Sequence, residues 1–272
     1  MIARCELRET FTDSKMVITL LVLGFIYDNG ARKMVLAAQK AGVPLGFLEA
    51  FIRCLNDWRY GILFLFGFLF LWAGIPRINN EHIFSVYRAG KKVWLAGELI
   101  HLFIVSALYP LMLLGLCILG VSRYSFVGNI WSDFVIDYDL KYKKIVGSGL
   151  SINASVFRYD YPYKTALNAL LLMILCLLVL GSIVLFFSVI NKKIAGMIIV
   201  ILLIGCMVIF SNYRIWWMWL LPTSHSIISL HHIYVYKKYM VNLSFSYLYL
   251  TAVEIVLIIL SVLFLRKKNY YK

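Results

Sequence analysis

The chain has 272 residues, of which 62% are hydrophobic, and its formal net charge at neutral pH is +14. Soluble domains are nearer half apolar, so this composition and a mean hydropathy of +0.84 predict an integral membrane protein without a sizeable soluble domain. The basic residues lie between long apolar runs, which favours membrane topology and lipid contact over nucleic-acid binding. We therefore expect one all-α, polytopic membrane domain over residues 1–272.

The N-terminal residues and the cysteines argue against two other kinds of protein. Residues 1–15 mix acidic and basic side chains, and no small-residue cleavage site follows the first apolar run, so we expect no cleaved signal peptide. The five cysteines form no CxxC motif and no Cys/His cluster. Their placement therefore indicates neither a disulfide framework nor a metal centre.

Six apolar runs qualify as candidate transmembrane helices, because a crossing takes roughly 20 residues. The first run is short and the other five are clearer. The predicted spans cover residues of about 16–36, 59–75, 98–120, 165–190, 195–211 and 247–265. With the N-terminus inside, the inner and outer segments carry similar numbers of Lys and Arg, but the inner segments are far shorter. Because charge in short loops sets topology, we predict that both termini are cytoplasmic. If the first run does not cross, the N-terminus moves outside and the other five spans keep their direction.

The connector between the second and third spans is the most informative stretch. Residues 76–97 (PRINNEHIFSVYRAGKKVWLAG) place Glu81, Ser85, Arg88 and Lys92 on one face of a helix and apolar side chains on the other. A short basic amphipathic helix between two spans either rests on anionic lipid headgroups or docks a cytoplasmic partner. A plain membrane-surface loop is the general alternative.

The outer segments are patterned as well. Residues 46–56 (GFLEAFIRCLN) place apolar side chains opposite Glu49, Arg53 and Asn56, which predicts an interfacial helix that lies on the outer leaflet or re-enters it slightly. Residues 122–164 contain several aspartates and many aromatic residues, and a loop of that length is uncommon without structure of its own. We expect this segment to pack as a cap over the outer mouth of the bundle.

Two shorter outer segments also have patterns that predict local structure. Within the cap, the alternation of lysine and tyrosine over residues 141–144 suits a short strand or an interfacial segment. Between the fifth and sixth spans, Pro222 predicts a turn, and a second interfacial helix follows it, carrying His225, His231 and His232.

Ionisable residues inside predicted spans are the candidate functional groups. Glu254 lies about 10 Å deep in the last span, where a carboxylate marks a pathway or gate, or else is a hydrogen-bonded structural residue. Glu98 and His101 share one face at the inner end of the third span, and they are either a structural pair or a second pathway element. The three outer histidines do not form a metal set, because the adjacent pair diverges and no acid completes it.

The chain has no sequence signature of catalysis or of nucleotide binding. The aspartates of the cap have no nucleophile-elbow or related context, so the sequence does not indicate an enzyme. Gly90-Lys91-Lys92 lacks both the first glycine and the hydroxyl of a phosphate-binding loop. Any drive from ATP and Mg²⁺ must therefore come from another chain.

Four stretches in order resemble one known family. They are residues 47–77 (FLEAFIRCLNDWRYGILFLFGFLFLWAGIPR), 87–111 (YRAGKKVWLAGELIHLFIVSALYPL), 171–203 (LLMILCLLVLGSIVLFFSVINKKIAGMIIVILL) and 217–230 (WMWLLPTSHSIISL). Together they resemble the type-2 permeases of bacterial ATP-binding-cassette (ABC) exporters, especially short Gram-positive ones. The chain departs from the family pattern in its short N-terminal elbow, residues 1–15 at most, and in its large outer cap.

The resemblance implies a permease subunit in a bacterial cell membrane that exports a peptide-like or amphipathic substrate by alternating access. Its partners would be a nucleotide-binding ATPase subunit, a second permease chain (identical or homologous) and membrane lipids. A coupling helix at residues 81–92 would seat in the ATPase, with contacts from Arg77, Glu81, Phe84, Tyr87, Arg88, Lys91 and Lys92. Two alternatives stay open: a membrane-embedded lipid-modifying enzyme that uses outer His and Asp residues, and an accessory or immunity protein that binds a peptide without transporting it.

Overall fold

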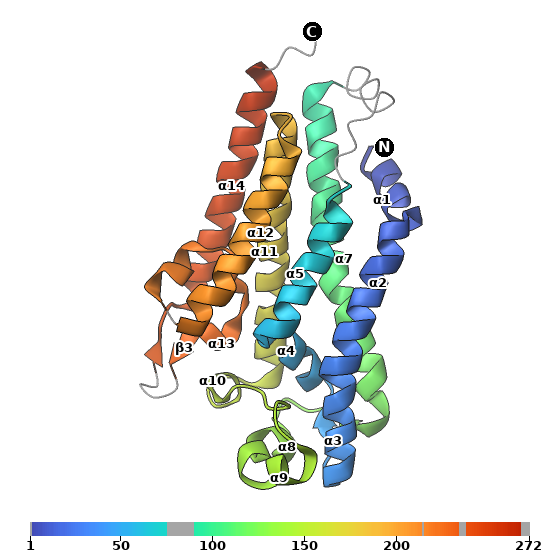
Figure 1. Ribbon diagram of the computed structural model, residues 1–272, viewed down its shortest axis with the longest axis vertical. Coiled ribbons are helices and arrows are strands. Elements are labelled where there is room, and N and C mark those ends of the chain that lie inside the picture. The colour runs from blue at the N-terminus through green and yellow to red at the C-terminus, as the bar shows by residue number, and fades with distance from the viewer. Residues whose placement is uncertain (1, 75–89, 214, 234–237, 268–272) are drawn as a thin grey trace.

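The structure is a computed structural model that describes residues 2–74, 90–213, 215–233 and 238–267. Long helices run side by side, and most of the short elements gather at one end, while the two chain termini lie at the other end (Figure 1). The chain is mostly helical, as the composition predicts. The common end of the termini agrees with an even number of crossings.

Among the described residues, four helices are long and apolar enough to cross a membrane: α7 (Lys91–Val121), α11 (Pro162–Val189), α12 (Lys193–Tyr213) and α14 (Leu243–Lys267). Two bent helix pairs bring the total to six if each pair is one span. These helices correspond to the six predicted spans, so the multi-pass architecture is confirmed, with four to six crossings by length and composition.

α11 is the central helix of the bundle. It packs against α14, α12 and α7, and two thirds of its most apolar window (67%) is buried, against 17% for α14. Pro162 starts α11 at a position where its missing N–H is not needed. At the other end, Asn191 takes a positive φ of 60° and turns the chain into α12. In this hairpin, a Cβ added to Gly196 would lie 2.7 Å from the Cβ of Phe187.

The first bent pair forms the N-terminal part of the bundle. α1 (Ile2–Thr12) meets the rod of α2 (Ser14–Ile26), the π-helix η1 (Tyr27–Arg32) and α3 (Lys33–Ala41) at an angle of 66°. Asp13 sits at the bend and its side chain accepts a hydrogen bond from the backbone N–H of Lys15, which caps α2. α1 packs on α7 and α2 on α5, so the short elbow is part of the bundle.

The second bent pair is a broken span or a re-entrant segment, so of the two alternatives predicted for residues 46–56 a helix lying on the outer leaflet is corrected and a re-entering one stays open. α4 (Glu49–Asn56) turns by 80° into α5 (Trp58–Trp72), with Asp57 capping α5. The predicted polar face is wrong, because Glu49 and Arg53 are 0% and 3% exposed. α4 is packed between η1, α7 and α11 and is held there by polar contacts to distant segments.

The outer cap is built from short elements that pack over the end of the bundle opposite the termini (Figure 1). They are η2 (Ser122–Tyr124), β2 (Ser125–Phe126), α8 (Asp133–Ile136), η3 (Tyr138–Tyr142), α9 (Lys143–Val146) and α10 (Ala154–Phe157). β2 pairs in parallel with β1 (Leu45–Gly46). The alternative of a strand over residues 141–144 is wrong, since this stretch is helical. Phe134 of α8 and Tyr138 of η3 are buried within the cap.

The segment between α12 and α14 is also compact. It contains η4 (Trp216–Leu220), η5 (Ser224–Ser226), α13 (Ile228–His231), β3 (His232–Ile233) and β4 (Lys238–Tyr239). The turn predicted at Pro222 is present. The single interfacial helix predicted after it is wrong, because several one-turn pieces replace it and residues 222–229 are buried against the bundle.

Candidate functional site

The predicted ATPase contact is described only at its last residues. Arg77, Glu81, Phe84, Tyr87 and Arg88 lie outside the described residues. Gly90 has a φ of 85° and no helical conformation, and α7 begins at the next residue. A continuous helix over residues 81–92 is therefore wrong at its end, and Lys91 and Lys92 form the first turn of α7.

The two ends of the connector leave the bundle beside the chain termini. Gly74 follows the last residue of α5 by two positions. A Cβ added to Gly74 would collide with the Lys15 ammonium, so this end of α5 lies at the bend between α1 and α2. Gly90 and Lys91 lie across a pocket from Leu265, near the end of α14. Residues 75–89 thus connect two points at the same end of the bundle (Figure 1).

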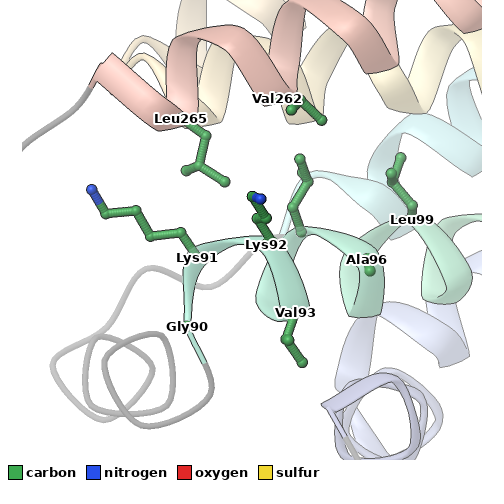
Figure 2. A pocket seen from close by; sticks show the side chains of 9 residues that line it. Gly90, Lys91, Lys92, Val93, Ala96, Leu99, Val262 and Leu265 are labelled. Carbon is green, nitrogen blue, oxygen red and sulfur yellow. The ribbon is translucent and has the colours of Figure 1, made fainter.

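The pocket between α7 and α14 has a volume of about 580 Å³. Its walls are aliphatic, and two lysines stand at one end. The lining residues are Gly90, Lys91, Lys92, Val93, Leu95, Ala96, Leu99, Val262 and Leu265. Figure 2 shows Leu265 and Val262 of α14 pointing toward α7, while Lys91 and Lys92 extend from its first turn. Trp94, Leu185 and Val189 pack with Leu95 and Leu265 in a small separate core beside it.

Glu98 and His101 lie on α7 about two turns further along and are 1% and 0% exposed. The Thr10 hydroxyl donates its hydrogen to the backbone oxygen of Glu6, so His101 Nε2 is the donor in its 3.1 Å contact with Thr10. The other ring nitrogen, His101 Nδ1, lies 4.0 Å from Glu98 Oε2. Neither atom has a hydrogen-bond partner among the described residues. The pair is thus two buried polar side chains that face each other on α7.

A line of contacts runs from this pair across the bundle. The ring centroid of Trp72 lies 5.4 Å from that of His101, and its indole N–H donates to the Gly181 oxygen of α11 over 3.2 Å. The next residue, Ser182, donates its hydroxyl to Glu254 Oε1 of α14 over 2.6 Å. The three residues predicted to mark a pathway or gate are therefore joined through α5 and α11. We call this line, from Thr10 to Glu254, the polar belt.

Two outer histidines share one serine. Ser246 Oγ lies 2.7 Å from His225 Nδ1 and 2.8 Å from His231 Nε2, and all three residues are fully buried. The remaining ring nitrogens contact backbone oxygens, those of Trp219 at 2.9 Å and Ile227 at 3.1 Å. Burial lowers the pKa of His225, and it lowers the pKa of His231 to about 4. Both rings are neutral at physiological pH.

No group of three His, Cys, Asp or Glu side chains that could hold a metal occurs among the described residues. The expectation that His225, His231 and His232 form no metal set stays a prediction.

A buried polar cluster at the outer end escaped the sequence analysis. Glu49 Oε1 accepts the Ser132 backbone N–H at 2.6 Å, and Oε2 accepts the Ser132 hydroxyl at 2.7 Å and the Gly46 N–H at 3.0 Å. Arg53 donates to the backbone oxygens of Gly30 and Gly149. A signal was present: apolar residues surround Glu49 and Arg53 on nearly every side of the helix, which leaves no broad solvent face.

Comparisons with known proteins give no family from which a function can be assigned. No protein-family model matches the chain, and neither a curated protein nor a solved structure matches it.

Proposed function

We propose that this chain is the permease subunit of an ABC exporter in a bacterial cell membrane, with both termini in the cytoplasm. It moves a peptide-like or amphipathic substrate outward by alternating access. The chain supplies the membrane pathway, while ATP and Mg²⁺ are bound and ATP is hydrolysed by a partner subunit. A second permease chain, identical or homologous, completes the route.

One observation carries the proposal. The basic connector joins two long bundle helices, α5 and α7, at the end of the molecule that also holds both termini. A partner that pulls on residues 75–89 acts directly on α7, which contacts α1, α11 and α14. Because Gly90 separates this connector from α7, we centre the ATPase contact on Phe84, Tyr87 and Arg88, with Arg77 and Glu81 beside them.

The polar belt is the candidate pathway or gate. It joins Glu98 and His101 on α7 to Glu254 on α14, two helices whose inner ends are separated by the pocket. Buried ionisable side chains inside a membrane are expensive to maintain, which favours a functional role over a packing role. Movement of α7 relative to α11 and α14 would break and remake this line of contacts.

Co-purification of an ATPase tests the proposal. The wild-type chain, isolated from its own cells in mild detergent, should retain an ATPase, and Phe84→Asp with Arg88→Glu should release it. The matched control is Leu140→Asp with Lys144→Glu on the outer cap, at the opposite end of the bundle. It likewise replaces one apolar residue with Asp and one basic residue with Glu. Retention of the ATPase by the connector variant, or its equal loss from the control, contradicts the assigned contact.

A lipid-modifying enzyme is the second candidate, and one observation favours it. Ser246 lies within hydrogen-bond distance of two histidines, the arrangement in which a base activates a hydroxyl nucleophile. All three side chains are fully buried, so a substrate would have to displace η5 and α13 first. Turnover of labelled phospholipid that disappears in His225→Ala and His231→Ala would establish the enzyme.

An accessory or immunity protein is the remaining alternative. It would bind a peptide through the outer cap and move nothing. Vesicles that contain the chain and its ATPase separate the two cases, since ATP-dependent uptake of substrate occurs only with a transporter.

A further inference from the structure

Arg53 of α4 is a buried cation without a carboxylate partner in the described part of the chain. The residue is 3% exposed. No ion pair of the described residues includes Arg53, although Glu49 lies one turn away on the same helix. The Glu49 carboxylate accepts instead from Gly46 and Ser132. A guanidinium keeps its charge at physiological pH, and a buried charge is costly unless it is paired. This cost favours a functional role for Arg53 over a packing role.

The guanidinium is held by neutral groups from three segments. One terminal nitrogen, Nη1, donates to the Gly30 oxygen of η1. The other, Nη2, donates to the Gly149 oxygen of the outer cap over 2.8 Å. The Tyr60 ring of α5 lies with its centroid 5.6 Å from the guanidinium carbon. The third nitrogen, Nε, is buried and has no hydrogen-bond partner among the described residues. Backbone oxygens and one aromatic ring therefore surround a charge that they do not neutralise.

Nε lies on an edge of the guanidinium that recognises carboxylates. A carboxylate can bind arginine side-on as a fork, with one oxygen on Nε and the other on Nη2. On this edge, the Gly149 carbonyl accepts from Nη2, whereas Nε donates to none of the described residues. The Gly149 oxygen thus stands where one carboxylate oxygen would lie. A carboxylate that replaced it would accept two hydrogen bonds in place of one, and it would also pair the buried charge.

Gly149 belongs to a short loop between α9 and α10 that can move without moving the long helices. Residues 147–149 are exposed on the outer cap. Gly147 and Gly149 have φ angles of 94° and 87°, a conformation that glycine adopts at little cost. The buried Tyr138 hydroxyl fixes both flanks, because it donates to the Gly147 oxygen over 2.6 Å and accepts from the Leu150 N–H over 3.0 Å. Rotation between these two anchors would lift the Gly149 carbonyl off Arg53 and open the edge to the outer side.

We infer that Arg53 binds a carboxylate at the outer end of the bundle, in competition with the Gly149 carbonyl. When the loop lifts, the carboxylate takes Nε and Nη2 together, while the Gly30 oxygen and the Tyr60 ring keep the guanidinium in place. The carboxylate belongs to a small organic acid or to the end of a peptide, and these present the same chemistry to the site. The inference goes beyond the proposed function, since neither the ATPase contact nor the polar belt takes part in it.

NMR of the full chain in detergent, with isotope-labelled arginine, tests the inference. The probe is sodium acetate, exchanged for sodium chloride at constant ionic strength and pH. We expect a saturable change in the Nε–H resonance of Arg53, which is identified by its loss in Arg53→Lys. Arg32 is the control in the same spectrum, because its guanidinium is exposed and already paired with Asp28 over 2.7 Å. Its resonance should show no saturable change.

Two variants of the loop make the test specific. Gly149→Ala disfavours the closed loop, because a residue with a Cβ avoids a φ of 87°. The edge is then open more often, so the apparent affinity for acetate should rise about fivefold. Ser148→Ala changes the adjacent exposed residue without restricting the backbone, and it should keep the wild-type affinity. Both variants retain Arg53, so this comparison holds even if Arg53→Lys does not fold.

Trialanine and its C-terminal amide distinguish the two sources of the carboxylate. The acid should bind and the amide should not, because only the acid offers two anionic oxygens to the fork. Tighter binding of trialanine than of acetate assigns the site to a peptide end, and equal binding assigns it to a small organic acid.

Each contrary result overturns the inference. If the Arg53 resonance does not change in the wild type or in Gly149→Ala, the guanidinium only clamps the cap loop. If Arg32 responds equally, the effect is one of bulk ions, and if the amide binds like the acid, the carboxylate is not what is recognised. Equal affinities of Gly149→Ala and Ser148→Ala mean that the Gly149 carbonyl does not compete. ATPase co-purification is measured separately with the Phe84 and Arg88 variant, so failure of the carboxylate site and failure of the transporter assignment are distinguishable.

Discussion

Replacing Glu49 with alanine should release the outer cap from the bundle. The Glu49 carboxylate accepts from three donors on two distant segments: the backbone N–H of Gly46 in β1, and both the backbone N–H and the hydroxyl of Ser132 before α8. Alanine leaves the two backbone N–H groups buried without an acceptor. An unsatisfied buried donor costs about 1–3 kcal/mol, so the expected loss is about 2–6 kcal/mol.

Two matched variants should lose less stability than Glu49→Ala, because each keeps part of the hydrogen bonding. Glu49→Gln keeps the shape of the side chain and one acceptor oxygen, and it should lose roughly half as much stability as alanine. Ser132→Ala removes only the hydroxyl and leaves the backbone contact intact, so a loss of about 1 kcal/mol is expected. The structure thus predicts the order Glu49→Ala, Glu49→Gln, Ser132→Ala from most to least destabilised.

Thermal unfolding in detergent, followed by tryptophan fluorescence, gives this order, and limited proteolysis reports the cap directly. Cleavage within residues 122–164 should become faster in Glu49→Ala before the long helices unfold, because the cap opens locally. If Glu49→Ala and Ser132→Ala agree within about 0.5 kcal/mol and their caps are cut at the same rate, then water replaces the carboxylate and the reasoning fails.

Three further predictions concern other parts of the bundle. Gly196→Leu forces a side chain against α11 and should destabilise the protein by about 1–3 kcal/mol, whereas Gly205→Leu enters open space and should be nearly neutral; equal melting temperatures contradict this. Acidification from about pH 7.5 to about pH 5 should destabilise the wild type by about 2 kcal/mol, because unfolded His231 takes up a proton below its ordinary pKa of 6.5, while the folded ring, with its pKa lowered to about 4, stays neutral. This part of the pH dependence should vanish in His231→Gln, and a pH profile unchanged by that substitution refutes the assignment. Ser182→Ala should cost about 1–3 kcal/mol by leaving Glu254 unsatisfied, and adding Glu254→Leu should restore most of it; strictly additive losses in the double variant contradict the pairing.

The long helices could be predicted from sequence because each is apolar around its whole circumference. α11 follows its predicted span closely, and the Asn191 turn after it is signalled by the polar residues that interrupt the apolar runs. For such helices, length and hydropathy carry the information, and no knowledge of neighbours is needed. The six predicted crossings also agree with the common end of the two termini, because an even number of crossings returns the chain to the side where it began.

The polar contacts could not be predicted in the same way. Glu49 and Arg53 bind Ser132 and Gly149, which are 83 and 96 residues away, and periodicity within one helix does not encode partners at that distance. The helical spacing within residues 46–56 predicted that Glu49 and Arg53 face solvent, whereas packing against distant segments buries both side chains. Glu254 was identified from its depth in the span, but its partner on α11 came only from the fold.

The histidine pair at the outer end is one hydrogen short. Two neutral imidazoles and one hydroxyl bring three hydrogens, whereas Ser246, Trp219 and Ile227 offer four ring contacts that each require one. At any instant one contact has lone pairs on both sides. If His225 moves its proton to Nδ1, it donates to Ser246, and the serine hydroxyl must then donate to His231. The two rings are therefore coupled through the serine hydroxyl, and a mutation at either one reaches the other through it.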